Sequence, residues 1–324
     1  MRLCFHQCGR PQEVLSLEPY EAPEPHRHEV VVQMLYAPIN PADLNFIEGT
    51  YGKLPHHPAV PGNEGCGKVI GIGEEVTSLA VGDLVIPLYP LGVWSQHLVA
   101  AENKFAKLPT DLDPVQASML RVNPTTAWQL LQEFRDLQPG DIIAQNAANS
   151  GVGQAIIQIA RHLDIKTINF VRRKELFTEL TALGADLVFL DDAEGHAEAK
   201  KFVDSQKLTL ALNAVGGDSA LRLMDLLSPD GALVTYGAMS RRSLKVPNKH
   251  LIFKNLEIRG YWLSKWAETA SHLEMQEVLR PLATMMLKGQ LKLPVDQIVP
   301  MTHYREAISL AQGQGRNGKI IIKF

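Results

Sequence analysis

The sequence predicts an α/β fold in two parts, with a β-rich barrel in its first third and a doubly wound parallel sheet after it. Two observations lead to this prediction. Residues 1 to about 118 contain short apolar runs of strand length that are separated by Gly and Pro. From about residue 120, strand-like runs alternate with amphipathic stretches of helix length. Such alternation is typical of a parallel sheet wrapped by helices.

The spacing of apolar residues predicts the individual elements. In the first part, strands are expected at 29–35, 67–72 and 83–87. In the second part we expect strands at 141–146, 166–171, 186–190, 208–214 and 231–236, and helices at 152–163, 174–183, 195–205 and 218–227.

The end of the chain is predicted to return to the first part. A strand is expected at 256–261, an amphipathic helix near 270–288, and a terminal strand at 318–324. The predicted domains are therefore residues 1–119 together with 267–324, and residues 120–266.

Composition and charge are those of an ordinary globular protein. Of the 324 residues, 45% are hydrophobic and 21% are charged, and the net charge of -3 argues against a general affinity for nucleic acid or anionic membranes. No apolar run is long enough to span a bilayer, and the first residues lack a signal or transit pattern, so a cytoplasmic protein is expected. The odd number of cysteines, Cys4, Cys8 and Cys66, favours reduced thiols.

A glycine-containing turn between a strand and a helix is the most informative motif. Its six positions correspond to the pattern G-x-G-x-x-G and are Ala148, Asn149, Ser150, Gly151, Val152 and Gly153. Small residues replace two of the three glycines, so the flanking strand and helix carry the interpretation. Backbone N–H groups at a helix N-terminus bind phosphates, and the turn is therefore predicted to hold a dinucleotide pyrophosphate.

The end of the second parallel strand indicates which dinucleotide binds. Sites specific for NAD usually have a carboxylate there, whereas this chain has Arg172, Arg173 and Lys174 before its first acid, Glu175. The alternative is a solvated basic turn. Three cations at a helix N-terminus are locally unfavourable without an anion, however, so we expect NADPH as the cofactor.

Three segments, residues 39–55, 145–154 and 260–266, resemble one group of enzymes. Over its whole length the chain resembles the medium-chain dehydrogenase/reductase superfamily. Within it, the chain is similar to the trans-2-enoyl thioester reductases of the mitochondrial type, with quinone oxidoreductases as near relatives. The resemblance implies a Rossmann cofactor domain and a GroES-like catalytic domain. The segments 62–65 and 81–83 support the fold alone.

A metal is not expected. Zinc alcohol dehydrogenases of this superfamily have a histidine where this chain has Asn63, and asparagine is a poor zinc ligand. There is no cluster of four cysteines, and Cys4 and Cys8 lack partners at a useful spacing. The pair His56 and His57 is expected to be structural or solvated, because adjacent histidines seldom bind one ion.

Reduction of an activated C=C bond needs a proton donor as well as a hydride. The resemblance implies Tyr51 as the donor. The local sequence agrees, because Asn40 can cap a short helix with Pro41 at its first position, and Gly49 can end it. Tyr51 then lies on a loop that can face a cleft. The alternative is a tyrosine that packs against the loop.

The resemblance implies further residues around the cofactor. Asn123 is expected beside the nicotinamide, although it also has the sequence of a helix N-cap before proline. Trp262 is alternatively an ordinary core or interface aromatic residue, and Trp266 is interpreted as one. The remaining residues implied to line the cofactor are Tyr236, Gly237, Ala238, Met239, Tyr261, Leu263, Ser264 and Lys319.

The leading hypothesis is NADPH-dependent reduction of trans-2-enoyl thioesters carried by CoA or acyl carrier protein, a reaction of fatty acid metabolism. The second is reduction of quinones or small enones, which needs the same cofactor. The third is a dinucleotide-binding protein with a structural or regulatory role. By resemblance alone, a homodimer is expected through edge strands near 245–262.

Overall fold

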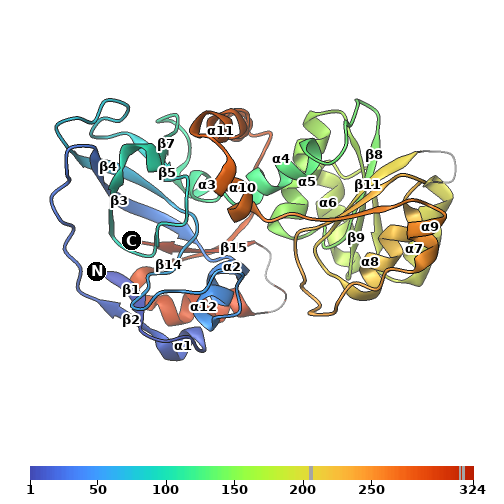
Figure 1. Ribbon diagram of the computed structural model, residues 1–324, viewed down its shortest axis with the longest axis horizontal. Coiled ribbons are helices and arrows are strands. Elements are labelled where there is room, and N and C mark those ends of the chain that lie inside the picture. Colours follow the sequence, from blue (N-terminus) through green and yellow to red (C-terminus); the bar gives the residue numbers. More distant parts are fainter. Residues whose placement is uncertain (204–206, 314, 316–317) are drawn as a thin grey trace. The chain divides into compact units, whose positions relative to one another are not determined.

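The computed structural model describes residues 1–203, 207–313, 315 and 318–324 (Figure 1). The chain divides into two compact units, which are described one at a time. Unit 1 comprises Met1–Val122 and Trp266–Phe324, and unit 2 comprises Asn123–Lys265. None of the described helices combines the length and the apolar character that crossing a membrane requires.

Unit 2 contains a six-stranded sheet in which all neighbouring strands are parallel. The strand order β10-β9-β8-β11-β12-β13 reverses direction at β8, as in doubly wound nucleotide-binding folds. The strands are β8 (Ile142–Gln145), β9 (Lys166–Val171), β10 (Leu187–Leu190), β11 (Leu208–Asn213), β12 (Ala232–Thr235) and β13 (Glu257–Gly260).

Helices connect these strands, as the alternation in the sequence predicts. They are α4 (Asn123–Gln132), α5 (Gly151–His162), α6 (Phe177–Leu183), α7 (Ala193–Val203), α8 (Gly217–Leu226) and α9 (Asn248–Ile252), with a short turn η2 at Lys174–Leu176. All four residues of β8 are buried, because strands in the middle of a parallel sheet are covered on both faces. The α/β prediction with a parallel sheet is confirmed.

Unit 1 is built around a seven-stranded sheet with the path β14-β15-β3-β4-β5-β7, and β6 also pairs with β3. Strand β15 pairs antiparallel with β3, so the chain's end returns to this unit, as predicted. The strands are β3 (Glu29–Pro38), β4 (Cys66–Ile72), β5 (Leu84–Pro87), β6 (His97–Ala101), β7 (Phe105–Lys107), β14 (Val295–Pro300) and β15 (Lys319–Lys323).

A second, two-stranded sheet in unit 1 consists of β1 (Arg2–Phe5) and β2 (Leu15–Glu18). The helices of the unit are α1 (Pro11–Val14), α2 (Pro41–Glu48), α3 (Pro114–Ser118), α11 (His272–Leu287) and α12 (Tyr304–Gln312), with short turns η1 (Glu102–Lys104) and η3 (Met301–His303). Helix α10 (Leu263–Thr269) crosses the boundary between the units in the sequence.

Helix α2 has the ends that the sequence predicts. Asn40 precedes it, Pro41 is its first residue, and Gly49 follows it in the left-handed conformation with φ of 73°. The carboxylate of Asp43 accepts a hydrogen bond of 2.7 Å from the backbone N–H of Asn40 and thereby satisfies a donor at the helix start. The chain therefore leaves α2 in a fixed direction just before Tyr51.

A buried polar network holds the start of α2 against the rest of unit 1. The side chain of Asn40 donates to Glu64 Oε1 at 2.7 Å and accepts a hydrogen bond from the ammonium group of Lys319. The other oxygen of Glu64 accepts from the backbone N–H of Val122 at 2.7 Å. The oxygen and the nitrogen of the Asn40 carboxamide are thus both hydrogen-bonded. Their partners come from distant parts of the sequence, so the network holds these segments together.

Burial dominates the titration of the two carboxyl groups in this network. Burial raises the pKa of Glu64 to about 7, although the charge of Lys319 and the hydrogen bond from Asn40 act in the opposite direction. Burial also raises the pKa of Asp43. The folded state therefore keeps a proton on Glu64 at pH values where the unfolded chain has lost it.

The first prediction concerns this proton. Its contribution to stability is complete below pH 4.5, the ordinary pKa of a glutamate, and is lost as the pH rises through about 7. A Glu64→Gln variant stays neutral at every pH. Its free energy of unfolding should therefore fall less than that of the parent between pH 5 and 8, and the difference should reach roughly 3 kcal/mol. Urea unfolding across this range measures the effect. The exposed Glu24→Gln variant is the control, and parallel profiles for parent and Glu64→Gln would contradict the assignment.

Candidate active site

The turn after β8 forms the centre of the candidate site in unit 2. Ala147 has a left-handed conformation with φ of 47°, and Ser150 then caps α5 by accepting a hydrogen bond of 3.1 Å from the N–H of Gly153. A Cβ atom on Gly153 would lie 2.6 Å from the carbonyl oxygen of Ala148, so the close approach requires glycine. The first N–H groups of α5, at Gly151 and Val152, belong to the helix terminus that attracts anions.

The three cations of the sequence motif lie at the end of β9, next to this turn in the sheet. Strand β9 pairs with β8, so the carboxyl ends of both strands meet at the same edge. Arg172, Arg173 and Lys174 are exposed, and within the described part of the chain none of them forms an ion pair. These positive charges are therefore available to an anionic ligand beside the turn.

The ends of β12 and β13 bring the next predicted residues to the same edge. Tyr236 directly follows β12, and burial raises the pKa of its hydroxyl group while the nearby Ser150 acts in the opposite direction. Gly237, Ala238 and Met239 come next, the last two with exposed side chains. After β13, the ring of Tyr261 packs edge-on against Phe134 with centroids 6.2 Å apart, and Trp262, Leu263 and Ser264 are half-buried.

Asn123 differs slightly from the prediction. It is the first residue of α4 and is 5% exposed, whereas the sequence suggested the capping position before the helix. The difference of one position is small, because the assigned start of a helix shifts by a residue depending on which hydrogen bonds close its first turn. Trp266, interpreted as a core or interface aromatic residue, is half-buried in α10.

A polar network at the strand ends was missed from the sequence. The amide of Asn146, the residue after β8, donates to Asn213 Oδ1 and to Ser219 Oγ, both at 2.8 Å. Ser219 in turn donates to Asp191 at 2.6 Å, and Arg222 pairs with the same carboxylate at 2.6 Å. Asparagine at the end of an apolar strand, at 146 and again at 213, is the signal that could have identified it.

Tyr51 and Lys319 lie in unit 1, while the other predicted residues belong to unit 2. Tyr51 is half-buried on the bend that follows α2. An ion pair of 2.7 Å between Lys53 and Glu268 links this loop to α10 within the same unit. Lys319, the first residue of β15, is 9% exposed and belongs to the network around Asn40.

The position of the zinc-binding histidine is occupied by a residue with other partners. Asn63 donates its side-chain amide to Asp43 Oδ1 at 2.6 Å and its backbone N–H to the same oxygen at 2.8 Å. Arg121 donates to the carbonyl oxygen of Asn63 at 2.9 Å. The carboxamide is therefore held as a donor to a carboxylate.

His57 packs edge-on against Phe5, with ring centroids 5.3 Å apart.

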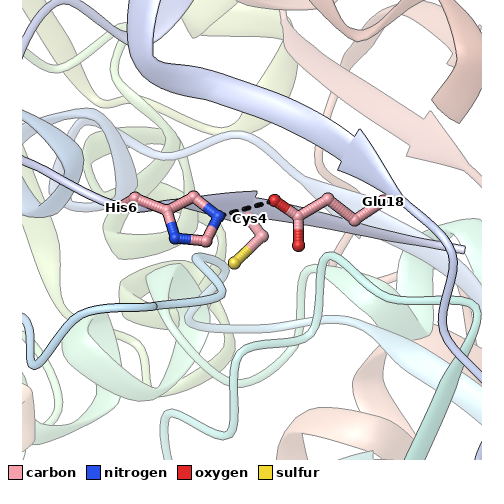
Figure 2. A group of neighbouring side chains, drawn as sticks. All are labelled: Cys4, His6 and Glu18. Atoms are coloured by element: carbon pink, nitrogen blue, oxygen red, sulfur yellow. Dashed lines mark hydrogen bonds and ion pairs between the residues drawn. The ribbon is translucent and has the colours of Figure 1, made fainter.

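Cys4 and Cys8 lack sequence partners at a useful spacing, yet the structure brings other side chains close to both thiols. The thiol of Cys8 lies 3.6 Å from His57 Nε2, and the thiol of Cys4 lies beside His6 and Glu18 (Figure 2). Glu18 lies near Cys4 because β1 pairs with β2, which brings together residues that are distant in the sequence and leaves no sign in the spacing of the cysteines.

Two family models match the chain. The alcohol dehydrogenase GroES-like domain matches residues 26–110, and the zinc-binding dehydrogenase model matches residues 151–282. The enoyl-[acyl-carrier-protein] reductase, mitochondrial, of Rattus norvegicus is 43% identical over 94% of this chain and 84% of its own length.

Solved structures agree with this result. The complex of Candida tropicalis Etr1p with NADP and crotonyl-CoA matches with a TM-score of 0.92 and 28% identity, over 100% of this chain and 99% of the other. Escherichia coli quinone oxidoreductase, solved with NADPH, matches with a TM-score of 0.89 and 25% identity over the same shares.

The relatives also correct one prediction. Curated relatives from rat, mouse, human and Arabidopsis thaliana are all named as mitochondrial, so the expectation of a cytoplasmic protein is contradicted. The physical reason is that targeting signals separate from the fold specify location, so neither the composition nor the pattern of the first residues in this sequence decides it.

Two observations lead to one assignment. They are the parallel sheet with its glycine turn and the 43% identity over 94% of the sequence. The chain belongs to the medium-chain dehydrogenase/reductase superfamily, in the family of the mitochondrial enoyl-[acyl-carrier-protein] reductases.

Proposed function

We propose that this protein reduces the C=C bond of trans-2-enoyl thioesters with NADPH. The observation that carries the proposal is the 43% identity, over 94% of the chain, to a relative named as an enoyl-[acyl-carrier-protein] reductase. The similarity to Etr1p with NADP and crotonyl-CoA supports the same cofactor and substrate class. The acyl group is carried by CoA or by acyl carrier protein.

The residues at the sheet edge of unit 2 fit a phosphorylated dinucleotide. Asn149 to Gly153 form the start of α5 and would hold the pyrophosphate, since the helix terminus favours negative charge. Arg172, Arg173 and Lys174 would bind the 2′-phosphate through charge-assisted hydrogen bonds. The other residues proposed to line the cofactor are Asn123, Tyr236, Gly237, Ala238, Met239, Tyr261, Trp262, Leu263, Ser264 and Lys319.

The reaction requires a hydride at one carbon of the double bond and a proton at its neighbour. NADPH, when bound, supplies the hydride. Tyr51 would donate the proton, or orient the water that does, from the loop that begins at Gly49. The negative charge that develops on the thioester oxygen would be stabilised by hydrogen-bond donors of the site.

We propose that the reaction does not use a metal. Asn63 is engaged with Asp43 through two hydrogen bonds, so its carboxamide would have to leave a carboxylate before it could turn toward an ion. Asparagine is in addition a weak ligand for zinc compared with histidine or cysteine. Tyr51 and water then remain as the sources of the proton.

A quinone or enone reductase is the second candidate function. The similarity to Escherichia coli quinone oxidoreductase, at a TM-score of 0.89, favours it, and the proposed cofactor residues would serve both reactions. Turnover on crotonyl-CoA that exceeds turnover on a naphthoquinone supports the first function, and the reverse order supports the second.

We also propose that two copies associate through the edge of the unit 2 sheet. Strand β13 is paired on one side, with β12, among the described strands. In the segment before it, Ile252 and Phe253 are 68% and 81% exposed, and Leu251 is exposed as well. An apolar patch beside an open strand edge is typical of a protein interface.

The second prediction concerns cofactor choice. Replacing Arg172 and Arg173 together by Ala should raise the KM for NADPH more than about tenfold and leave the KM for NADH nearly unchanged, because each charge-assisted hydrogen bond contributes roughly 1.5–3 kcal/mol. Steady-state kinetics with both cofactors measures this. The control is the exposed pair Lys200 and Lys201 in α7, replaced in the same way. Equal losses with both cofactors would refute the assignment of the 2′-phosphate site.

The third prediction concerns Tyr51. The Tyr51→Phe variant should keep its thermal stability and its affinity for NADPH, but kcat for crotonyl-CoA should fall by about 10²–10⁴-fold, the usual effect of a general acid. Naphthoquinone reduction should fall much less, because quinone oxygens accept protons from water. Tyr20→Phe, at another half-buried tyrosine of unit 1, provides the control. If Tyr51→Phe is as fast as the parent on crotonyl-CoA, Tyr51 is not the donor.

The fourth prediction concerns metal in the reaction. Turnover of crotonyl-CoA should be unchanged after dialysis against a strong chelator, because no step of the proposed mechanism passes through an ion. Activity before and after dialysis is compared, with metal content measured in the same samples. Activity that disappears with the metal and returns with added zinc would contradict a metal-free reaction.

A further inference from the structure

The short sheet of β1 and β2 places five polar side chains on one face. Its antiparallel register pairs Cys4 with Ser16 and Arg2 with Glu18. Side chains two residues apart along a strand share a face, so Arg2, Cys4 and His6 lie on the same side as Ser16 and Glu18. The alternate positions, Leu3, Phe5 and Leu15, are buried in the core of unit 1. The core therefore fixes which way the polar set points.

Three of these residues bring the atoms of a metal site together (Figure 2). The Cys4 thiol, an imidazole nitrogen of His6 and a carboxylate oxygen of Glu18 lie within 4.8 Å of one another. His6 Nε2 and Glu18 Oε1 are 2.8 Å apart. Ligands around a tetrahedral zinc ion, with bonds of about 2.0–2.3 Å, are roughly 3.5 Å apart. Small side-chain rotations would therefore be enough to surround an ion.

The surroundings of the cluster suit a thiophilic cation. Cys4 is 1% exposed, whereas the side chains of His6 and Glu18 are 64% and 27% exposed, so the site has a buried thiol and an open side toward solvent. Ser16 donates a hydrogen bond of 2.8 Å to Glu18 Oε1 and orients the carboxylate, as outer partners of metal ligands commonly do. Burial and the charge of Glu18 raise the pKa of the Cys4 thiol, while the nearby Arg2 lowers it.

We propose that Cys4, His6 and Glu18 bind a thiophilic divalent cation of the zinc type, with a water molecule as the fourth ligand. The ion displaces the thiol proton of Cys4, which passes to the solvent, so that Cys4 binds as a thiolate. His6 binds as the neutral imidazole through Nε2 with its proton on Nδ1, and the ion takes the place of the hydrogen bond between Nε2 and Glu18. The bound ion joins β1 to β2. This site is separate from the proposed reaction, and it replaces the expectation that the chain binds no metal at all.

Cobalt provides a direct test, because a tetrahedral Co²⁺ thiolate site has an intense near-ultraviolet charge-transfer band as well as visible bands. Co²⁺ alone is titrated into the reduced, metal-free full-length protein. We expect one equivalent to produce both sets of bands and one equivalent of Zn²⁺ to remove them, since zinc binds such sites more tightly. Thermal unfolding measured with Zn²⁺ should occur at a higher temperature than without it.

Variants determine whether these three residues are the ligands. Cys4→Ser should abolish the charge-transfer band. His6→Gln should weaken Co²⁺ binding more than about a hundredfold, because losing even an outer partner of a metal ligand lowers metal affinity by about 10–100-fold. Cys8→Ser is the matched control, since Cys8 also has a histidine beside it but no third ligand among the described residues. Turnover of crotonyl-CoA should be the same in all three variants and the parent.

Three outcomes of the charge-transfer measurements would overturn the site, and a fourth outcome comes from the binding titration of His6→Gln. The first three are a parent protein without a charge-transfer band, a band that persists in Cys4→Ser, and a band that is lost in Cys8→Ser. His6 is largely exposed, so His6→Gln remains informative even if replacement of the buried thiol prevents folding. If Co²⁺ binds equally well to the parent and to His6→Gln, the proposal is wrong.

Discussion

The parallel pairing of the six strands in unit 2 is the constraint on which the candidate cofactor site depends. Parallel strands end at a common edge, so the residues that follow β8, β9, β12 and β13 are brought together although they are far apart in the sequence. The turn at 147–153 is possible because Gly153 lets α5 start against the carbonyl of Ala148. A side chain there would displace the helix, and the anion-binding end of α5 would leave that edge.

Unit 1 depends on a different interaction, the burial of two carboxyl groups around Asn40. Asp43 engages the start of α2 and Asn63, while Glu64 is bonded to Asn40 and to the backbone of Val122. Removing a partner from such a network leaves a polar group unsatisfied in the core, which is costly. The same bonds fix α2, and α2 with Gly49 directs the loop that carries Tyr51.

The two regions with metal-ligand chemistry in unit 1 illustrate how partners decide the role of a residue. At position 63 an amide donates to Asp43, and a carboxamide is a weaker zinc ligand than the histidine of the zinc enzymes. Beside β1, a thiol, an imidazole and a carboxylate meet on one face of a hairpin-like sheet. The family motif identified the first region from the sequence. The second region forms because the register of β1 and β2 brings its residues together.

The sequence by itself determined the elements and their type. Alternating strands and helices, the caps of α2 at Asn40 and Gly49, and the terminal strand were readable because local spacing reports which side chains are buried. Only the tertiary structure decided which distant residues meet: Asn63 with Asp43, Asn146 with Asn213, and Cys4 with His6 and Glu18. Those contacts depend on register and strand order, which are set by packing of the whole sheet and leave no periodic signal along the chain.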